Sequence, residues 1–206
     1  MRKMILICLL ILFVTGCSSE PEILDRSEGT IEGISYKQTD EVTNYIQIVM
    51  ENNDVILIEL YPEYAPITVE NFQDLVSREF YDGTMFHRVM EGFMIQGGQS
   101  ATNEPTDTII GEFANNGINN PIRHERGVIS MARTMVSMDS ASSQFFIMHE
   151  IAPSLDDDYA AFGRVIAGMD AVDRIATTAV DASNPSAPIP IRPQVVRTIR
   201  FVTIER

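Results

Sequence analysis

Cysteine is scarce in this sequence, with Cys8 and Cys17 the only two among 206 residues. Cys8 lies in an apolar run that we expect to be removed with an export signal, so one cysteine would remain. A single cysteine cannot form a disulfide within its own chain. The exported part must therefore take its stability from a hydrophobic core.

Basic residues are also few, with 15 Lys and Arg against 29 Asp and Glu. Loss of Arg2 and Lys3 with the signal would leave 13 basic against 29 acidic residues, a balance of −16. Such a charge repels the phosphates of nucleic acids and the headgroups of anionic lipids. We expect no nucleic-acid partner and no electrostatic adhesion to a membrane.

The chain has no tryptophan and three histidines, His87, His124 and His149, whose spacing does not match a metal site. It also lacks a G-x-S-x-G nucleophile motif and a phosphate-binding loop. We therefore expect no metal, no cofactor and no covalent catalysis.

The only long apolar run extends from Met4 to Val14 and follows a basic start. Eleven helical residues rise about 16 Å, roughly half the hydrocarbon thickness of a bilayer, so the run is too short to span it. The pattern is typical of a secretory signal, and residues 14–17, Val-Thr-Gly-Cys, resemble the lipobox of bacterial lipoproteins. This resemblance implies cleavage before Cys17 and attachment of diacylglycerol to it. An ordinary secretory signal is the alternative.

Three parts of the chain follow from these signals. Residues 1–16 are predicted to be a lipoprotein signal peptide, residues 17–42 the lipidated cysteine and a flexible polar tether, and residues 43–206 one compact domain. The protein is expected outside the cytoplasm, anchored to a bacterial membrane through its lipid only, as a monomer.

Within the domain, β-rich segments 45–50 and 55–60 flank the turn-forming residues 51–54 and predict a hairpin. Apolar residues at helical spacing predict helices over 68–76, with a proline near the start, and over 169–176. Short apolar runs and a closing segment at 195–204 predict many further strands. The pattern favours a mainly β fold, an antiparallel barrel with the helices at its ends.

Arg88 stands out among these segments. Residues 86–98 read Phe-His-Arg-Val-Met-Glu-Gly-Phe-Met-Ile-Gln-Gly-Gly, which places a permanent cation between aromatic and thioether side chains. A guanidinium is seldom placed there unless it must hold something polar. A structural ion pair is the alternative interpretation.

This segment and three further blocks, 127–132, 143–147 and 161–165, occur in an order that resembles the cyclophilin family of peptidyl-prolyl cis-trans isomerases. The resemblance runs from about residue 45 to 205. It implies a closed eight-stranded antiparallel β-barrel capped by two α-helices. It also implies an enzyme that rotates X-Pro bonds. Together with the export signal, this predicts an isomerase that acts on exported polypeptides and assists their folding.

The resemblance implies a role for ten residues. Arg88 would be the catalytic residue, and the substrate-binding residues would be Phe93, Met94, Gln96, Ala132, Arg133, Gln144, Phe146, Leu155 and Tyr159. From periodicity alone, the apolar members would be interpreted as ordinary barrel core. Ser154 stands where several family members have a tryptophan that contributes chiefly to cyclosporin binding, so we expect weak inhibition by that drug.

Two other functions stay open at this point. The same groove could serve a chaperone or holdase that binds proline-containing segments with incidental turnover, using Met135 and Met138 as an adaptable surface. A purely structural envelope lipoprotein is a weaker alternative, because it would not require Arg88, Gln96 and Gln144 together. Proline-containing polypeptides are the expected partners of the first two functions.

Overall fold

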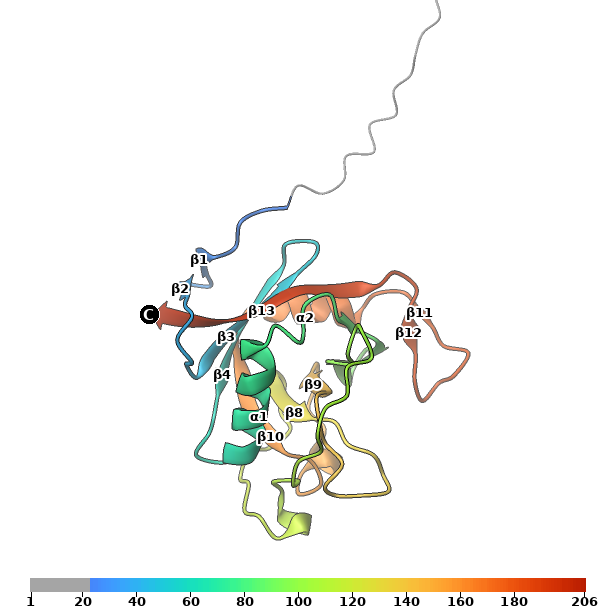
Figure 1. The fold of residues 1–206 in the computed structure, drawn as a ribbon. Coiled ribbons are helices and arrows are strands. Elements are labelled where there is room, and N and C mark those ends of the chain that lie inside the picture. Colours follow the sequence, from blue (N-terminus) through green and yellow to red (C-terminus); the bar gives the residue numbers. More distant parts are fainter. Residues whose placement is uncertain (1–22) are drawn as a thin grey trace, which may run out of the picture.

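The computed structural model describes residues 23–206 (Figure 1). The predicted signal peptide and Cys17 lie outside the described residues. No helix in the described part is long and apolar enough to cross a membrane.

A ring of antiparallel strands forms the body of the domain. Its members are β3 (Tyr45–Met50), β4 (Val55–Leu60), β5 (Met85–Phe86), β6 (Arg88–Met90), β7 (Met94–Gly97), β8 (Val128–Met131), β9 (Phe145–Met148), β10 (Ala161–Ala167) and β13 (Gln194–Glu205). Neighbours pair in the order β13-β3-β4-β10-β8-β9-β7-β6, and β5 pairs back to β13. Only His87 separates β5 from β6. Taken as one strand, β5 and β6 close the predicted ring of eight.

The strands alternate between two apolar faces. Along β3, Ile46 and Ile48 lie in the main core, while Val49 belongs to a second cluster outside the ring. Because successive side chains of a strand point to opposite faces, both faces of β3 are packed. The main core fills the inside of the ring.

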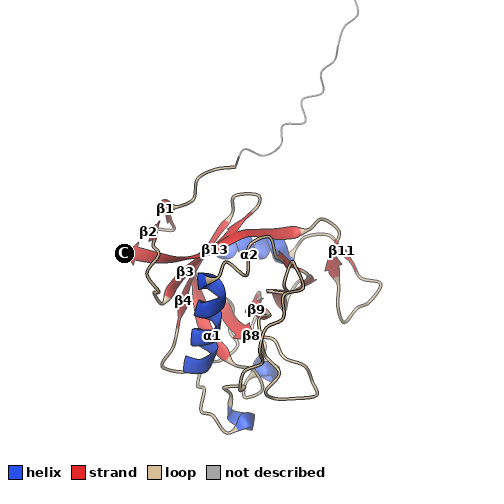
Figure 2. Cartoon of the chain, in the orientation of Figure 1, coloured by secondary structure: helices blue, strands red, loops and turns tan. Residues whose placement is uncertain are grey.

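Two helices cap this core, as predicted (Figure 2). Helix α1 (Pro66–Ser77) starts two residues before the predicted range and buries Val69, Phe72, Leu75 and Val76. Helix α2 covers Met169–Ala176, the predicted range, and follows Gly168, whose φ is 87°. A Cβ at Gly168 would lie 2.2 Å from the Val55 carbonyl oxygen, so glycine is required there.

Two short 3₁₀ turns, η1 (Ala114–Asn116) and η2 (Pro153–Leu155), interrupt the long connections. The proline-rich segment before β13 contains a short antiparallel pair, β11 (Val180–Asp181) and β12 (Ile189–Pro190). In Figure 1 this ribbon projects from the side of the body.

The N-terminal segment differs from the prediction. Residues 17–42 were expected to be a flexible tether, but β1 (Glu28–Ile31) and β2 (Ile34–Gln38) form a hairpin, and β2 pairs with the far end of β13. Glu32 and Gly33 both have positive φ, 50° and 82°, as a two-residue hairpin turn requires.

The hairpin is ordered by a partner distant in sequence. Tyr36 is 4% exposed and packs with Val49, Leu57 and Val202 on the outside of the ring. The hairpin thus covers the second apolar cluster. The flexible-tether prediction is wrong for residues 28–38.

Candidate active site

Nine of the ten predicted site residues meet around one pocket of about 150 Å³. They are Arg88, Phe93, Met94, Gln96, Ala132, Arg133, Phe146, Leu155 and Tyr159. The tenth, Gln144, lines an adjoining pocket of about 190 Å³ that shares Gln96, Ala132 and Arg133 with the first. Residues far apart in sequence are therefore brought into one continuous groove.

The apolar part of the pocket is not the barrel core. Along β9, Phe145 and Ile147 point into the main core, whereas Phe146 belongs to a separate cluster on the opposite face. Met94 joins the same outer cluster, and Phe93, Leu155 and Tyr159 pack against it. The strand alternation thus assigns these side chains to the outer wall of the barrel, where a ligand can reach them.

Arg88 lies at one side of this pocket and is half-buried. Its Nε donates to the Ser186 carbonyl at 2.9 Å, and one terminal nitrogen donates to Gln96 Oε1 at 3.1 Å. The other terminal nitrogen lies 3.2 Å from Met90 Sδ. No carboxylate within residues 23–206 lies in ion-pair distance of this guanidinium.

The charge of Arg88 is therefore not neutralised by a partner in the described chain. Burial lowers the pKa of the Arg88 guanidinium from its ordinary value, and the Tyr159 hydroxyl opposes this effect. A cation that is partly withdrawn from water and has no counter-ion interacts strongly with any electron-rich atom that enters the pocket.

Two glutamines extend the polar side of the groove. Gln96 accepts from Arg88 and donates through Nε2 to Gln144 Oε1 at 2.9 Å. The main-chain carbonyl of Gln144 also accepts from the Ala132 N–H at 2.9 Å. The chain of contacts orients both amides along the groove, next to the apolar pocket.

Arg133 makes mainly internal contacts. Its Nε donates to the Asp158 carbonyl at 2.9 Å, and its guanidinium carbon lies 4.9 Å from the centroid of the Tyr159 ring. A cation stacked on an aromatic face in this way stabilises the wall of the pocket. The structure therefore gives Arg133 a supporting contact that the sequence did not predict.

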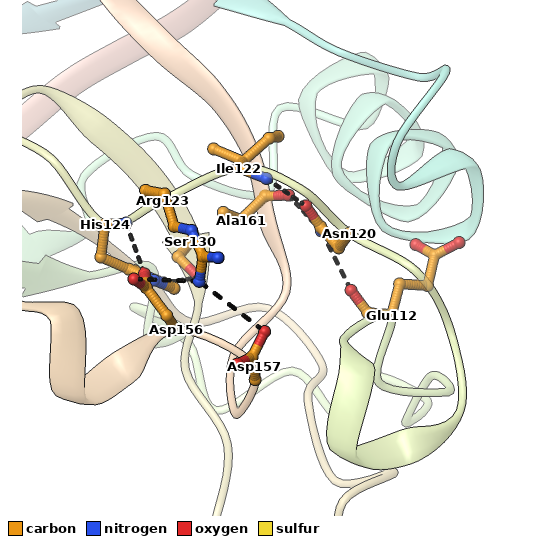
Figure 3. A network of polar contacts seen from close by, with 9 residues as sticks. All are labelled: Glu112, Asn120, Ile122, Arg123, His124, Ser130, Asp156, Asp157 and Ala161. Atoms are coloured by element: carbon orange, nitrogen blue, oxygen red, sulfur yellow. Dashed lines mark hydrogen bonds and ion pairs between the residues drawn. The ribbon is translucent and has the colours of Figure 1, made fainter.

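Behind the pocket lies a buried polar chain (Figure 3). His124 is 1% exposed, its Nδ1 lies 3.0 Å from Asp156 Oδ1, and its Nε2 lies 3.1 Å from Ser130 Oγ. Because a carboxylate only accepts, Nδ1 carries the proton and Nε2 accepts from the Ser130 hydroxyl. The ring stacks on Phe146 with centroids 5.9 Å apart.

This arrangement resembles a Ser-His-Asp triad but cannot act as one. Ser130 is 0% exposed, so no substrate reaches its hydroxyl. Burial lowers the pKa of His124, although the hydrogen bond and charge of Asp156 oppose this. Burial alone would raise the pKa of Asp156, but hydrogen bonds from the His124 main chain and ring bring it below its ordinary value.

Replacing His124 with glutamine is expected to remove a pH-dependent part of the stability. A lowered folded-state pKa means that the unfolded chain takes up this proton first, so wild-type stability falls as the pH drops below about 6.5. Since glutamine does not titrate, we expect the wild-type advantage over His124→Gln in unfolding free energy to shrink between pH 7.5 and 5. Urea unfolding at several pH values measures this; a difference that stays constant would contradict it.

Sequence patterns gave no sign of several of these contacts. The Ser186 contact uses a main-chain carbonyl, which no residue type signals. His124 and Asp156 are 32 positions apart, and only the fold brings them together. Met90 lies inside the motif around Arg88, and its proximity to Arg88 could have been inferred from the alternation of side chains along β6.

Within residues 23–206 no group of three or more His, Cys, Asp or Glu is placed to hold a metal ion.

Fold and groove together define a class: a closed antiparallel barrel whose outer wall carries an apolar pocket beside an arginine that has no carboxylate partner in residues 23–206. Residues 45–196 match the family model described as "Cyclophilin type peptidyl-prolyl cis-trans isomerase/CLD". The chain belongs to this family and is a peptidyl-prolyl cis-trans isomerase.

Curated relatives agree. Peptidyl-prolyl cis-trans isomerase A of Dickeya dadantii (strain 3937) is 39% identical over 159 residues, covering 71% of this chain and 79% of that protein. A peptidyl-prolyl cis-trans isomerase of Acinetobacter baylyi (strain ATCC 33305 / BD413 / ADP1) is 41% identical over 157 residues, covering 72% and 81%.

Solved structures share the fold. A cyclophilin-type isomerase of Cryptosporidium parvum superposes with a TM-score of 0.67 at 24% identity, covering 79% of this chain and 98% of that one. A cyclophilin from Hirschia baltica gives a TM-score of 0.63 at 25% identity, covering 80% and 75%. The β1–β2 hairpin precedes the region that matches the family model.

Proposed function

We propose that this isomerase acts on exported polypeptides from a lipid anchor at Cys17, and that Arg88 supplies the electrostatic contact that speeds rotation of the X-Pro bond. One observation carries the mechanism: Arg88 presents a cation without a carboxylate partner in residues 23–206 at the mouth of an apolar pocket. The basic start and lipobox-like residues at 14–17 support the location.

Rotation about a peptide bond is opposed by amide resonance, with a barrier of roughly 18–20 kcal/mol. No bond is broken, so neither a nucleophile nor a general base is needed. Bringing a process of tens to hundreds of seconds to milliseconds requires about five powers of ten, or on the order of 7 kcal/mol of preferential binding to the twisted amide.

A hydrogen-bond donor meets this requirement. As the amide twists, the prolyl nitrogen becomes pyramidal and its lone pair localises, which creates an acceptor absent from the planar ground state. Arg88 can donate to that nitrogen or hold the carbonyl of the proline. The terminal nitrogen beside Met90 donates to a thioether, which is a weak acceptor. Exchanging this contact for a substrate atom therefore costs little binding energy.

The rest of the groove suits the remainder of the substrate. A proline ring offers apolar area and no donor, and Met94, Phe146 and Leu155 form a pocket of matching character. Gln96 and Gln144 supply amides for the peptide main chain next to it. The protein would act as a monomer, since every proposed contact comes from one chain.

The anchor is tested separately from the enzyme. Cells that express the full chain are grown with labelled fatty acid, and we expect label in the wild type but not in Cys17→Ala. Label retained in Cys17→Ala, or a wild type without label, would contradict the lipoprotein assignment and leave the isomerase mechanism untouched.

A second candidate function, a holdase, is favoured by one observation. The loop after Arg133 exposes Met135 and Val136, which are 82% and 96% accessible, beside the second pocket. Exposed, flexible apolar side chains suit transient binding of unfolded segments. For an isomerase, the same residues would favour apolar residues upstream of the proline.

The two functions separate in one comparison. An aggregation assay with an unfolded client tests binding, and a proline-peptide assay tests turnover. If Arg88→Ala loses turnover and still suppresses aggregation as wild type does, the groove also serves as a holdase. Loss of both together would assign the effect on clients to isomerisation.

A further inference from the structure

The loop between β11 and β12, residues 182–188, contacts the active-site arginine from far along the chain. The Ser186 carbonyl accepts from Arg88 Nε at 2.9 Å across 98 positions. The next strand residue is also held, because the Val89 N–H donates to the Pro188 carbonyl at 3.1 Å. The loop thus contacts both the side chain of Arg88 and the main chain beside it.

The loop has the internal restraints of a rigid element. The Ser186 N–H donates to Asn184 Oδ1 at 3.1 Å, and the Ala187 N–H donates to the Asn184 carbonyl at 3.0 Å. Pro185 and Pro188 fix the φ angles on either side of these turns. Pro188 is buried although residues 181–186 are exposed. The Ser186 carbonyl is therefore held in place on an otherwise exposed segment.

A carbonyl suits this position better than a carboxylate. A carboxylate at Nε would pair with the guanidinium and cancel the charge that a twisting amide needs, whereas a neutral carbonyl restrains direction and leaves the charge. The guanidinium is planar, so Ser186 at Nε and Gln96 at one terminal nitrogen together fix its plane.

We propose that the 182–188 loop is a positioning element for Arg88, with the Ser186 carbonyl setting the orientation in which the guanidinium meets the twisting amide. This inference rests on the proposed role of Arg88. Orientation affects the transition state more than ground-state binding, because the peptide is also held by the apolar pocket and the glutamines.

Two variants test the loop. In the first, residues 182–188 are replaced by Asn-Gly, which removes the carbonyl and leaves Asp181 opposite Ile189 across a two-residue turn. In the second, Asn184→Ala with Pro185→Gly, the loop keeps its length and loses its restraints. We expect kcat to fall about tenfold in the first and a few-fold in the second, with KM nearly unchanged. Ile189→Thr, an exposed change in the same ribbon, is the matched control and should match wild type.

A structural readout accompanies the kinetics. Protection of the Arg88 Nε–H against exchange with solvent, measured by ¹H–¹⁵N NMR, should fall in both loop variants and stay unchanged in Ile189→Thr. Thermal unfolding checks that each variant is folded. If the shortened loop does not fold, the Asn184→Ala/Pro185→Gly variant carries the test.

Combining each loop variant with Arg88→Ala separates this inference from the function on which it rests. If the loop acts through Arg88, the loop changes should not lower kcat any further in the Arg88→Ala background. Wild-type kcat in both loop variants, together with a strong loss in Arg88→Ala, would overturn the positioning role and leave the proposed function standing. An unchanged Arg88→Ala enzyme would instead overturn the mechanism itself.

Discussion

Replacing Arg88 with alanine is expected to lower kcat/KM for a proline-containing peptide by about 10²-fold or more. Removing one well-placed donor to a developing charge typically costs about 2.7–4 kcal/mol of transition-state stabilisation. Alanine also leaves Gln96 without the donor at 3.1 Å that orients it. A protease-coupled assay, or exchange NMR on a peptide with both isomers populated, measures the change.

Lysine at the same position is an informative comparison. Arg88→Lys keeps the positive charge but has no planar fork to bind Ser186 and Gln96 at once, so we expect intermediate activity. Arg78→Ala is the matched control, because Arg78 forms surface ion pairs with Asp74 and Glu104 and should leave activity unchanged. Full activity in Arg88→Ala would remove the electrostatic mechanism.

Replacing Glu112 with alanine is expected to destabilise the fold by about 3 kcal/mol. Glu112 is 2% exposed, and its carboxylate accepts from the main-chain N–H groups of Ile67 and Thr68 at 3.1 and 2.7 Å. The first N–H groups of a helix have no acceptor within the helix, and Ala65 provides no side-chain cap for α1. Glu112 supplies the missing acceptor. Leaving a buried donor unpaired costs about 1–3 kcal/mol, and the charge also interacts favourably with the helix dipole.

The loss should appear as a fall in Tm of about 6–12 °C. Glu112→Gln keeps one acceptor oxygen and should lose less. Glu70, exposed on the same helix, gives the control, since Glu70→Ala is expected within about 0.5 kcal/mol of wild type. Chemical denaturation followed by circular dichroism measures all three. A Glu112→Ala protein as stable as the control would show that the capping contact contributes nothing.

Much of the barrel could be predicted because its signals are local. The hairpin of residues 45–50 and 55–60 and the helix of residues 169–176 follow from period and turn residues, and the structure has the same ranges. Helix α1 starts two residues before the range predicted from its apolar spacing. Pro66 suits the first turn of a helix, and Glu112, 45 positions from Ile67, caps the start of α1.

The candidate site was predictable where side chains carry the chemistry. The ten residues came from the family resemblance, seven of them lie inside its motif blocks, and nine share one pocket. What could not be predicted depends on distant pairing or on main-chain groups. The β1–β2 hairpin is ordered by β13, the His124–Asp156 contact needs η2 to be in place, and the Ser186 carbonyl has no signature in a residue type.

The way the ring of strands closes has a consequence for when the enzyme becomes active. Arg88 begins β6, and the β5–β6 strand joins the ring by pairing with β13, the last strand of the chain. Ser186, which contacts Arg88, comes shortly before that strand. During synthesis, the arginine therefore gains its surroundings only when residues 186–195 have been made. We do not expect a chain that has not reached this segment to catalyse the isomerisation of its own prolines.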